Sequence, residues 1–217
     1  MRFGRTGAIL LFGLIAGCGT SVNETIPEYR EDYSLLTLPA VTNVPFEVVS
    51  QSKGNPPVWI YYSWVLGKDG NDNKVLFVTV YSKSATPLTD SLTKTPDETA
   101  QIKKAVESFT YDKLNESKTN VKIDEAKLKP HFDKWLAALT EQIAGGYAVN
   151  VENYWEKLRV AGQGSAGEFY RIFKRYMIDY SFYYKTALKI WDETAAKLPA
   201  DLKSSGTALV QSAFLPK

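Results

Sequence analysis

The sequence contains very few of the residues that build metal centres, disulfide frameworks or haem sites. Among its 217 residues there is one cysteine, Cys18, and one histidine, His131. A disulfide needs two cysteines and a Cys/His zinc site needs several such ligands, so both are excluded, as is a haem held by two histidines. We therefore expect neither a cofactor nor a bound metal.

The chain also lacks an excess of either charge once its first 17 residues are set apart. Those residues contain Arg2 and Arg5, and without them the 26 basic residues become 24, equal in number to the 24 acidic ones. Proteins that bind nucleic acids usually gather basic side chains on one face, where they replace phosphate counterions. The neutral body predicts that nucleic acid is not a partner.

The apolar stretch near the amino terminus is too short to be a permanent membrane span. It runs from Gly7 to Gly17, whereas a spanning helix takes about 20 residues. Arg2 and Arg5 precede it and small residues close it, which is the pattern of an export signal. We interpret residues 1–17 as a signal peptide that is removed from the mature protein.

The residues after this stretch carry the most specific motif of the chain. Ile15-Ala16-Gly17-Cys18 resembles the lipobox of bacterial lipoproteins, with Ile15 in place of the usual leucine. The resemblance implies that the thiol of Cys18 receives diacylglycerol and that the chain is cut just before it. The alternative is a buried structural cysteine in an ordinary amino-terminal helix. Gly19 stands where the family's inner-membrane retention signal is aspartate, which favours the outer membrane in a cell with two membranes.

A lipidated Cys18 makes the membrane a permanent partner of the protein. Two or three acyl chains, at about 0.8 kcal/mol per buried methylene, hold a protein far more firmly than one chain does. Residues 18–45 are polar and contain Pro27, Pro39 and Pro45, so we expect a lipidated, extended tether. Alternatively, part of this tether docks on the body or on a partner through the apolar residues Tyr29, Tyr33, Leu35, Leu36 and Leu38.

Residues 46–217 are expected to form a single α+β domain that begins with a small antiparallel sheet. Residues 46–49, 58–66 and 74–82 are rich in valine, isoleucine and aromatic residues, as strands are. The turn formers Gly67 to Asn73 lie between the last two segments. This order predicts a hairpin of residues 58–66 and 74–82 with a long loop.

The rest of the domain is expected to be helical. Thr95-Pro96-Asp97-Glu98 has the form of a capping box with proline at the first helical position. A second helix is expected from about Glu125 to Gly145-Gly146, with Pro130 marking a kink or its true start. A short helix is expected around residues 151–158. Ser165 to Glu168 resembles another capping box, and the spacing after it predicts one long aromatic helix ending before Pro199.

The possible catalytic and ligand-binding motifs are weak. Residues 162–167 match a dinucleotide-binding glycine pattern, but the strand and βαβ unit that this motif needs are not predicted. We expect an interhelical loop there. Asp69, Asn71, Asp72 and Asn73 have the oxygen atoms that calcium prefers, but their spacing is not that of an EF-hand and favours a hairpin turn. No serine has the local signature of a triad with His131.

The abundant aromatic side chains are the most informative candidates for a binding site. Nine of the 28 fall between Phe169 and Trp191. Tyrosine and tryptophan fill cores, anchor protein interfaces and line ligand clefts. Helical spacing favours the core, with an interface or a cleft as alternatives. The candidate binding residues are Trp59, Tyr61, Trp64, Tyr176, Tyr180, Tyr183 and Tyr184.

These observations predict a membrane-anchored, noncatalytic lipoprotein of the bacterial cell envelope that binds a protein or serves as an accessory subunit of an envelope assembly. The alternative is a lipoprotein that binds a sugar or an amine in an aromatic cleft between sheet and helices. A hydrolase is the third choice. A broad apolar outer patch favours the first hypothesis, and a concave pocket with convergent polar groups favours the second.

Overall fold

The structure is a computed structural model that describes residues 46–86, 94–119, 121, 123–160 and 164–215. The expected signal peptide, Cys18 and the tether lie outside the described residues. The strands are β1 (Phe46–Gln51), β2 (Trp64–Lys68), β3 (Lys74–Ser84), β4 (Val149–Val160) and β5 (Glu168–Asp179). The helices are α1 (Pro96–Lys118), α2 (Glu125–Gln142), α3 (Tyr180–Thr194) and α4 (Ala200–Phe214). Shorter helical segments are η1 (Val58–Tyr61), the π-helix η2 (Ile143–Tyr147) and η3 (Gly164–Gly167).

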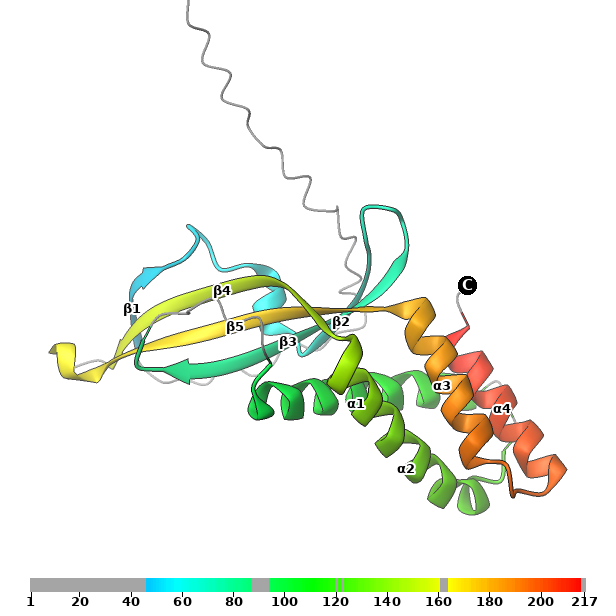
Figure 1. Cartoon of the computed structure of the whole chain (residues 1–217). Coiled ribbons are helices and arrows are strands. Elements are labelled where there is room, and N and C mark those ends of the chain that lie inside the picture. Colours follow the sequence, from blue (N-terminus) through cyan, green and yellow to red (C-terminus); the bar gives the residue numbers. More distant parts are fainter. Residues whose placement is uncertain (1–45, 87–93, 120, 122, 161–163, 216–217) are drawn as a thin grey trace, which may run out of the picture.

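The five described strands form one antiparallel sheet in the order β1-β4-β5-β3-β2. β4 and β5 form a long hairpin, and β5 also pairs with β3 over ten residues of each strand. β1 therefore lies at one edge of the sheet and β2 at the other. The four helices gather at one end of the sheet, and the opposite end, formed by β1 and the β4–β5 hairpin, projects away from them (Figure 1).

The main core lies between one face of the sheet and the helices. β3 turns Leu76, Val78 and Val80 toward this core, and α1 contributes Val106 and Phe109, all of them buried. Alternation along a strand and the three-to-four residue period of a helix place these apolar residues on facing surfaces. The other three helices add large fully buried side chains, namely Trp135, Leu139, Tyr183, Trp191, Leu209 and Phe214.

The opposite face of the sheet has two smaller apolar clusters. In one, Trp59 and Ile60 of η1 pack on Tyr154 of β4 and Phe173 of β5. In the other, residues of β2 and β3 pack together, namely Val65, Val75 and Phe77. Both faces of β3 are therefore apolar. This explains why its residues from Val75 to Val78 are all hydrophobic instead of alternating with polar residues.

The expected α+β fold is confirmed, and several elements lie where the sequence predicts them. β1 and β3 coincide with the strand segments 46–49 and 74–82. α1 begins at the predicted capping box, in which Glu98 N–H donates to Thr95 Oγ1 at 3.2 Å and Thr95 N–H donates to Glu98 Oε2 at 3.0 Å. α2 begins at Glu125 and accommodates Pro130 inside the helix, so Pro130 is not its start.

The predicted long aromatic helix from Ser165 is wrong in its first half. Residues 168–179 form β5, and only Tyr180–Thr194 form a helix, α3. Asp179 caps α3, because its Oδ1 accepts a hydrogen bond from Phe182 N–H. The apolar residues of 169–178 satisfy a helical period, but they also populate both faces of a strand. The pairing of β5 with β3 and β4 decides between the two.

Several other expected elements also differ from the structure. The short helix expected around residues 151–158 is wrong, because they belong to β4. The strand expected over 58–66 is a 3-10 turn, η1, followed by β2, which shortens the predicted hairpin. η3 stands between β4 and β5 in the chain, so the expected interhelical loop and second capping box are wrong, and Glu168 instead begins β5; residues 161–163 lie outside the described residues. α4 was not predicted, and the helices do not simply follow the strands, because β4 and β5 come after α2.

Candidate functional site

Four of the seven candidate aromatic residues lie in the main core. Trp64, Tyr176, Tyr180 and Tyr183 are at most 7% exposed and belong to one apolar cluster. Two of them also form hydrogen bonds inside the protein: the hydroxyls of Tyr183 and Thr110 are 2.7 Å apart, and Tyr176 Oη donates to Glu98 at 3.2 Å. Burial raises the pKa of Tyr183, and burial together with Glu98 raises that of Tyr176. These four side chains stabilise the fold.

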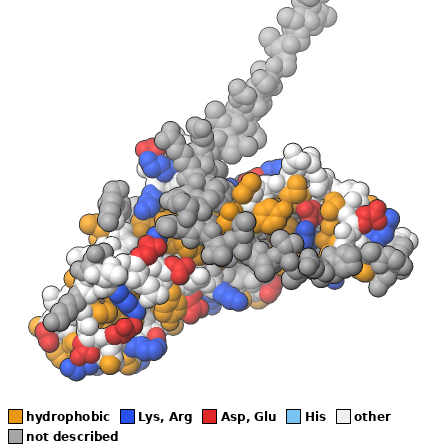
Figure 2. All heavy atoms as spheres, turned by 180° about the vertical axis from the view of Figure 1, so that it is seen from behind, with side chains coloured by type: hydrophobic (Ala, Val, Ile, Leu, Met, Phe, Trp, Pro, Cys, Tyr) orange, Lys and Arg blue, Asp and Glu red, His pale blue; other side chains and the backbone are white. Residues whose placement is uncertain are grey.

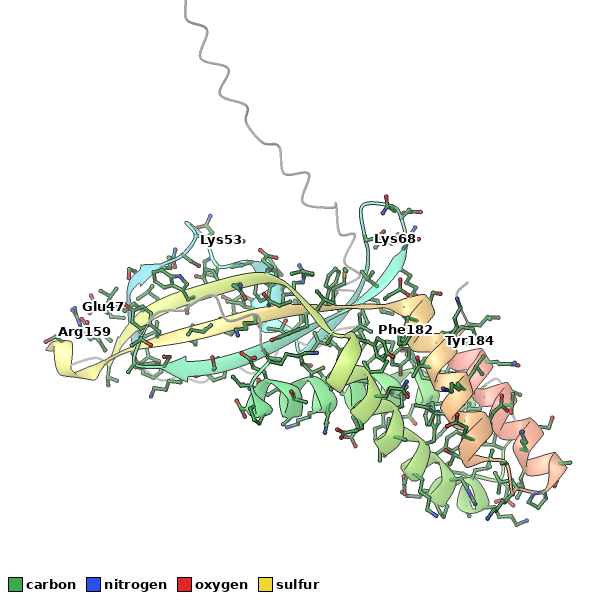
Figure 3. The ribbon with its side chains drawn as sticks, in the orientation of Figure 1. Glu47, Lys53, Lys68, Arg159, Phe182 and Tyr184 are labelled. Carbon is green, nitrogen blue, oxygen red and sulfur yellow. The ribbon has the colours of Figure 1, made fainter. Side chains whose placement is uncertain are left out.

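The other three candidate residues are not gathered at one place. Trp59 is buried in the apolar cluster on the opposite face of the sheet, whereas Tyr61, two residues further along, is 42% exposed. Tyr184 is half-buried and packs against the main core from α3, two residues after Phe182 (Figure 3). The structure thus divides the seven aromatic residues between the two faces of the sheet and does not form a common cleft from them.

The oxygen-rich loop between β2 and β3 uses its carboxylates to form a turn. Asp69 Oδ1 accepts hydrogen bonds from the backbone N–H groups of Asn71 and Asn73, and Asp69 Oδ2 accepts one from the Asn73 side chain. The Asn73 hydrogen bond lowers the pKa of Asp69. Asp72 has a positive φ of 64° and pairs with Lys68. No group of three or more His, Cys, Asp or Glu residues suited to a metal occurs among the described residues.

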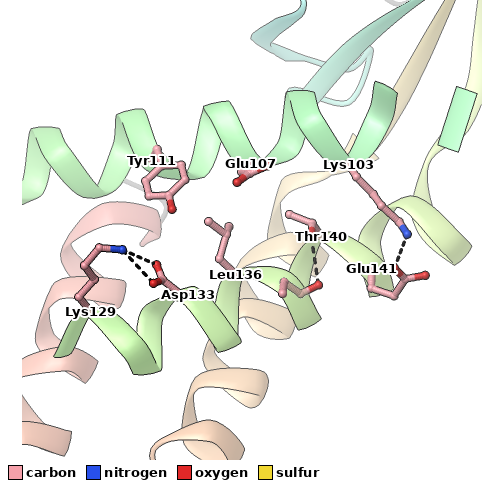
Figure 4. Close-up of a pocket in the computed structure, with 9 residues that line it drawn as sticks. Lys103, Glu107, Tyr111, Lys129, Asp133, Leu136, Thr140 and Glu141 are labelled. Atoms are coloured by element: carbon pink, nitrogen blue, oxygen red, sulfur yellow. Dashed lines mark hydrogen bonds and ion pairs between the residues drawn. The ribbon is translucent and has the colours of Figure 1, made fainter. Parts of the chain in front are cut away.

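A groove of about 590 Å³ lies between α1 and α2 (Figure 4). Leu136 and Ala137 are the apolar aliphatic residues of its lining, and ion pairs stand at its two ends: Lys103 with Glu141, and Lys129 Nζ with Asp133 Oδ2 at 2.8 Å. Its lining is mostly charged, and its aromatic member is Tyr111, which is 42% exposed. The groove is therefore polar and mixed in charge, unlike the aromatic cleft expected for a sugar or amine.

The exposed apolar side chains are most numerous along the sheet edge formed by β1, the last residue of η2 and the start of β4. We call it the β1/β4 edge. Of the eleven large hydrophobic side chains that are exposed among the described residues, six belong to it: Phe46, Val48, Val49, Tyr147, Val149 and Val151. Val48 is 50% exposed and Val149 is 58% exposed. Large apolar side chains gathered on one edge are unusual for a surface that faces only water.

Hydrophobic side chains with charged neighbours are also visible on the sheet end of the molecule when it is seen from behind (Figure 2). Along the edge, Lys53 pairs with Glu152 between the two apolar groups. Glu47 and Arg159 stand at the tip of the sheet, and Lys53 lies further along toward the helices (Figure 3). The β1/β4 edge is thus two apolar stretches separated by an ion pair, an arrangement suited to contact with another polypeptide.

Sequence reasoning identified β1 as a strand but did not identify its edge as a site. Two signals were available in the sequence: the exposed residues of β1 include the apolar run Val48-Val49, and Tyr147, Val149 and Val151 follow each other at a spacing of two. Both signals fit a buried strand equally well. Only the strand order shows that β1 lies at an edge.

Cys18, the candidate lipidation residue, lies outside the described residues. In the described part of the chain, no helix is both long and apolar enough to cross a membrane. The chain matches no protein-family model, and no curated protein or solved structure matches it significantly.

Proposed function

We propose that this protein is a noncatalytic lipoprotein of the bacterial cell envelope that binds another envelope protein through its β1/β4 edge. One observation carries the proposal: more than half of the exposed large hydrophobic side chains in the described residues gather on that edge. Burying them against a partner would release about 25 cal/mol for each Å² of apolar surface removed from water. An accessory subunit of a larger assembly would use such a surface.

The expected lipid anchor supports the same role. The Ile15-Ala16-Gly17-Cys18 motif and the apolar stretch before it favour attachment of Cys18 to a membrane, with the outer membrane favoured in a cell that has two. Phe46, the first described residue, begins β1 at the end of the sheet that projects away from the helices (Figure 1). The β1 part of the edge therefore follows directly after the tether in the chain. Anchoring would bring it near other envelope proteins.

The groove between α1 and α2 is the observation that favours the ligand-binding alternative. Its volume lies within the range of small-molecule sites, about 300–1,000 Å³. A ligand there would meet Tyr111 and the carboxylates of Glu107 and Asp133, so an amine would fit better than a neutral sugar. The test is a thermal-shift screen of amines, in which a stabilising amine must lose its effect in the Tyr111→Ala variant.

The proposed function is tested by photo-crosslinking in native membranes. A photoreactive amino acid replaces Val48 or Val149 in one pair of variants, and replaces Leu215 or Tyr111, which are also exposed but lie on the helices or at their end, in the control pair. We expect the same envelope protein to be crosslinked from both edge positions and from neither control position. Recovery of no neighbour from the edge, or of equal sets of neighbours from all four positions, would refute the proposed function.

A further inference from the structure

One row of side chains that runs across the sheet ends on β1 at Glu47, and the ion pair of Glu47 with its neighbour Arg159 is long. In one row, Glu47 lies opposite Arg159, and Arg159 lies opposite Glu168. Arg159 donates to Glu168 Oε1 through Nε at 3.1 Å and Nη2 at 2.6 Å, but its Nη1 is 3.6 Å from Glu47 Oε2. The row thus reads acid, base, acid. Its outermost member, Glu47, has a side chain that is 65% exposed.

The adjacent row, on the other face of the sheet, is apolar. Val48 lies opposite Leu158, and Leu158 lies opposite Phe169. The ring of Phe46 contacts that of Phe169 edge to face, with 5.4 Å between centroids. Because side chains alternate along a strand, Phe46 and Val48 point to one face of the sheet while Glu47 points to the other.

We propose that β1 accepts an extended strand of the partner protein, and that this strand contains a lysine or arginine between two apolar residues. The inference rests on the proposed function and names its mode of contact. As an edge strand, β1 has outward-facing backbone groups that can pair with another chain. The basic residue lies opposite Glu47 and continues the row of alternating charges, while the two apolar residues lie opposite Phe46 and Val48.

The negative charge of Glu47 favours a strand of another protein over two segments of this chain that could also pair with β1, namely residues 19–45 and β1 of a second copy. Residues 19–45 contain Glu24, Glu28, Glu31 and Asp32 against the single basic residue Arg30, so this segment is acidic like Glu47. A second copy of β1 has the sequence Phe-Glu-Val-Val-Ser-Gln and would bring another Glu47 with no base. Like charges on neighbouring strands are destabilising, so neither complements the row.

A bulge limits the length of the contact. The register between β1 and β4 shifts between Val48 and Ser50, so Val49 has no partner of its own on β4. Bulges bend an edge strand and restrict uncontrolled pairing. The regular part of the acceptor is therefore Phe46–Val48, which matches the three-residue pattern proposed for the partner and favours a weak, reversible interaction.

Two synthetic peptides test this inference with the full chain in detergent micelles: fluorescein-labelled Thr-Val-Lys-Val-Thr and Thr-Val-Glu-Val-Thr, measured by fluorescence anisotropy. We expect the lysine peptide to bind roughly three- to tenfold more tightly than the glutamate peptide. The Glu47→Lys variant should reverse this preference, because it reverses the charge at the end of the row. Glu193→Lys, an equal change at an exposed position of α3 that belongs to neither the β1/β4 edge nor the groove, should leave the preference unchanged.

A third peptide tests backbone pairing. N-methylation of the lysine peptide at alternate amides removes strand donors but keeps the side chains, so its binding should be lost. Equal binding of the lysine and glutamate peptides, retained binding of the methylated peptide, or a dimer of the chain that dissociates on Glu47→Lys substitution would each overturn the inference. Crosslinking from Val48 and Val149 to one protein, together with such a result, would leave the proposed function standing and refute only strand addition.

Discussion

A buried ion pair joins the amino-terminal end of α1 to the sheet. Glu98 is 3% exposed, and its Oε1 is 2.7 Å from Lys174 Nζ on β5, while Oε2 accepts from Tyr176 and from Thr95 N–H. Burial by itself raises the pKa of Glu98, but the hydrogen bonds and the Lys174 charge together outweigh burial and lower it. One side chain therefore serves as a cap and as the partner of a buried cation.

The Glu98→Gln substitution should destabilise the protein near neutral pH by about 3 kcal/mol. Glutamine can still serve in the capping box, but it leaves Lys174 buried without a carboxylate. Because the folded pKa of Glu98 is lowered, its contribution is complete above the ordinary glutamate pKa of about 4.3 and is lost as the pH falls through the folded value. The difference in unfolding free energy between variant and wild type should therefore shrink in acid.

Urea unfolding of both proteins at pH 7 and pH 3 measures this difference. Glu107→Gln is the matched control, because Glu107 is exposed on the same helix, and its effect should stay within about 0.5 kcal/mol at both pH values. A Glu98→Gln difference that is the same at pH 7 and pH 3 would contradict the role assigned to its charge.

At the scale of elements, the packing of α3 against α4 depends on one close approach. A Cβ atom at Gly206 of α4 would overlap the ring of Trp191 of α3. The Trp191 indole N–H also donates to Thr207 Oγ1 at 3.0 Å, which fixes the ring beside the glycine. The absence of a side chain at Gly206 therefore lets the two helices meet.

Gly206→Ala should lower the free energy of unfolding by about 1–3 kcal/mol, because the added methyl group overpacks a buried helix contact. Gly146→Ala is the control, since an added Cβ there meets no atom within 4 Å. Equilibrium urea denaturation of the two variants gives the comparison. If the Gly206 variant proves as stable as the Gly146 variant, the close contact between α3 and α4 is not the constraint described.

At the scale of the whole molecule, the proposed function combines two features of one chain: a lipid on Cys18 and a protein-binding sheet edge that begins at Phe46. Residues 18–217 contain equal numbers of basic and acidic side chains, so their net charge provides no general electrostatic attraction to a membrane or a partner. Attachment would come from acyl chains and specificity from a short strand. The two properties can be separated by mutation.

Metabolic labelling with radioactive palmitate tests the anchor. The wild-type protein should take up the label and begin at Cys18 by mass spectrometry of its amino-terminal peptide. The Cys18→Ala variant should stay unlabelled and keep residues 1–17, because lipid transfer needs the thiol. Val48→Ala, which alters only the edge, should be labelled normally. An unlabelled wild-type protein that retains its first 17 residues would contradict the lipoprotein hypothesis.

The sequence by itself determined the features that depend on neighbouring residues. The capping box at Thr95 to Glu98, the start of α2 at Glu125 and the strand β3 follow from hydrogen bonds and apolar spacing within a few residues, and the structure confirms them. The lipobox resemblance at Cys18 is also a local motif, and it remains a prediction.

Tertiary structure decided the identity of β4 and β5 and the location of the exposed edge. Residues 168–179 have aromatic and apolar side chains on both possible faces, so a helix and a doubly covered strand satisfy the same pattern. These residues pair with β3 and β4, which lie outside the segment itself, and this pairing resolves the ambiguity. Likewise, Val48 is apolar whether its strand lies in the centre or at the edge, and only the strand order exposes it. The hydrophobicity of a residue is fixed by its own side chain, whereas its burial depends on the residues that pack around it.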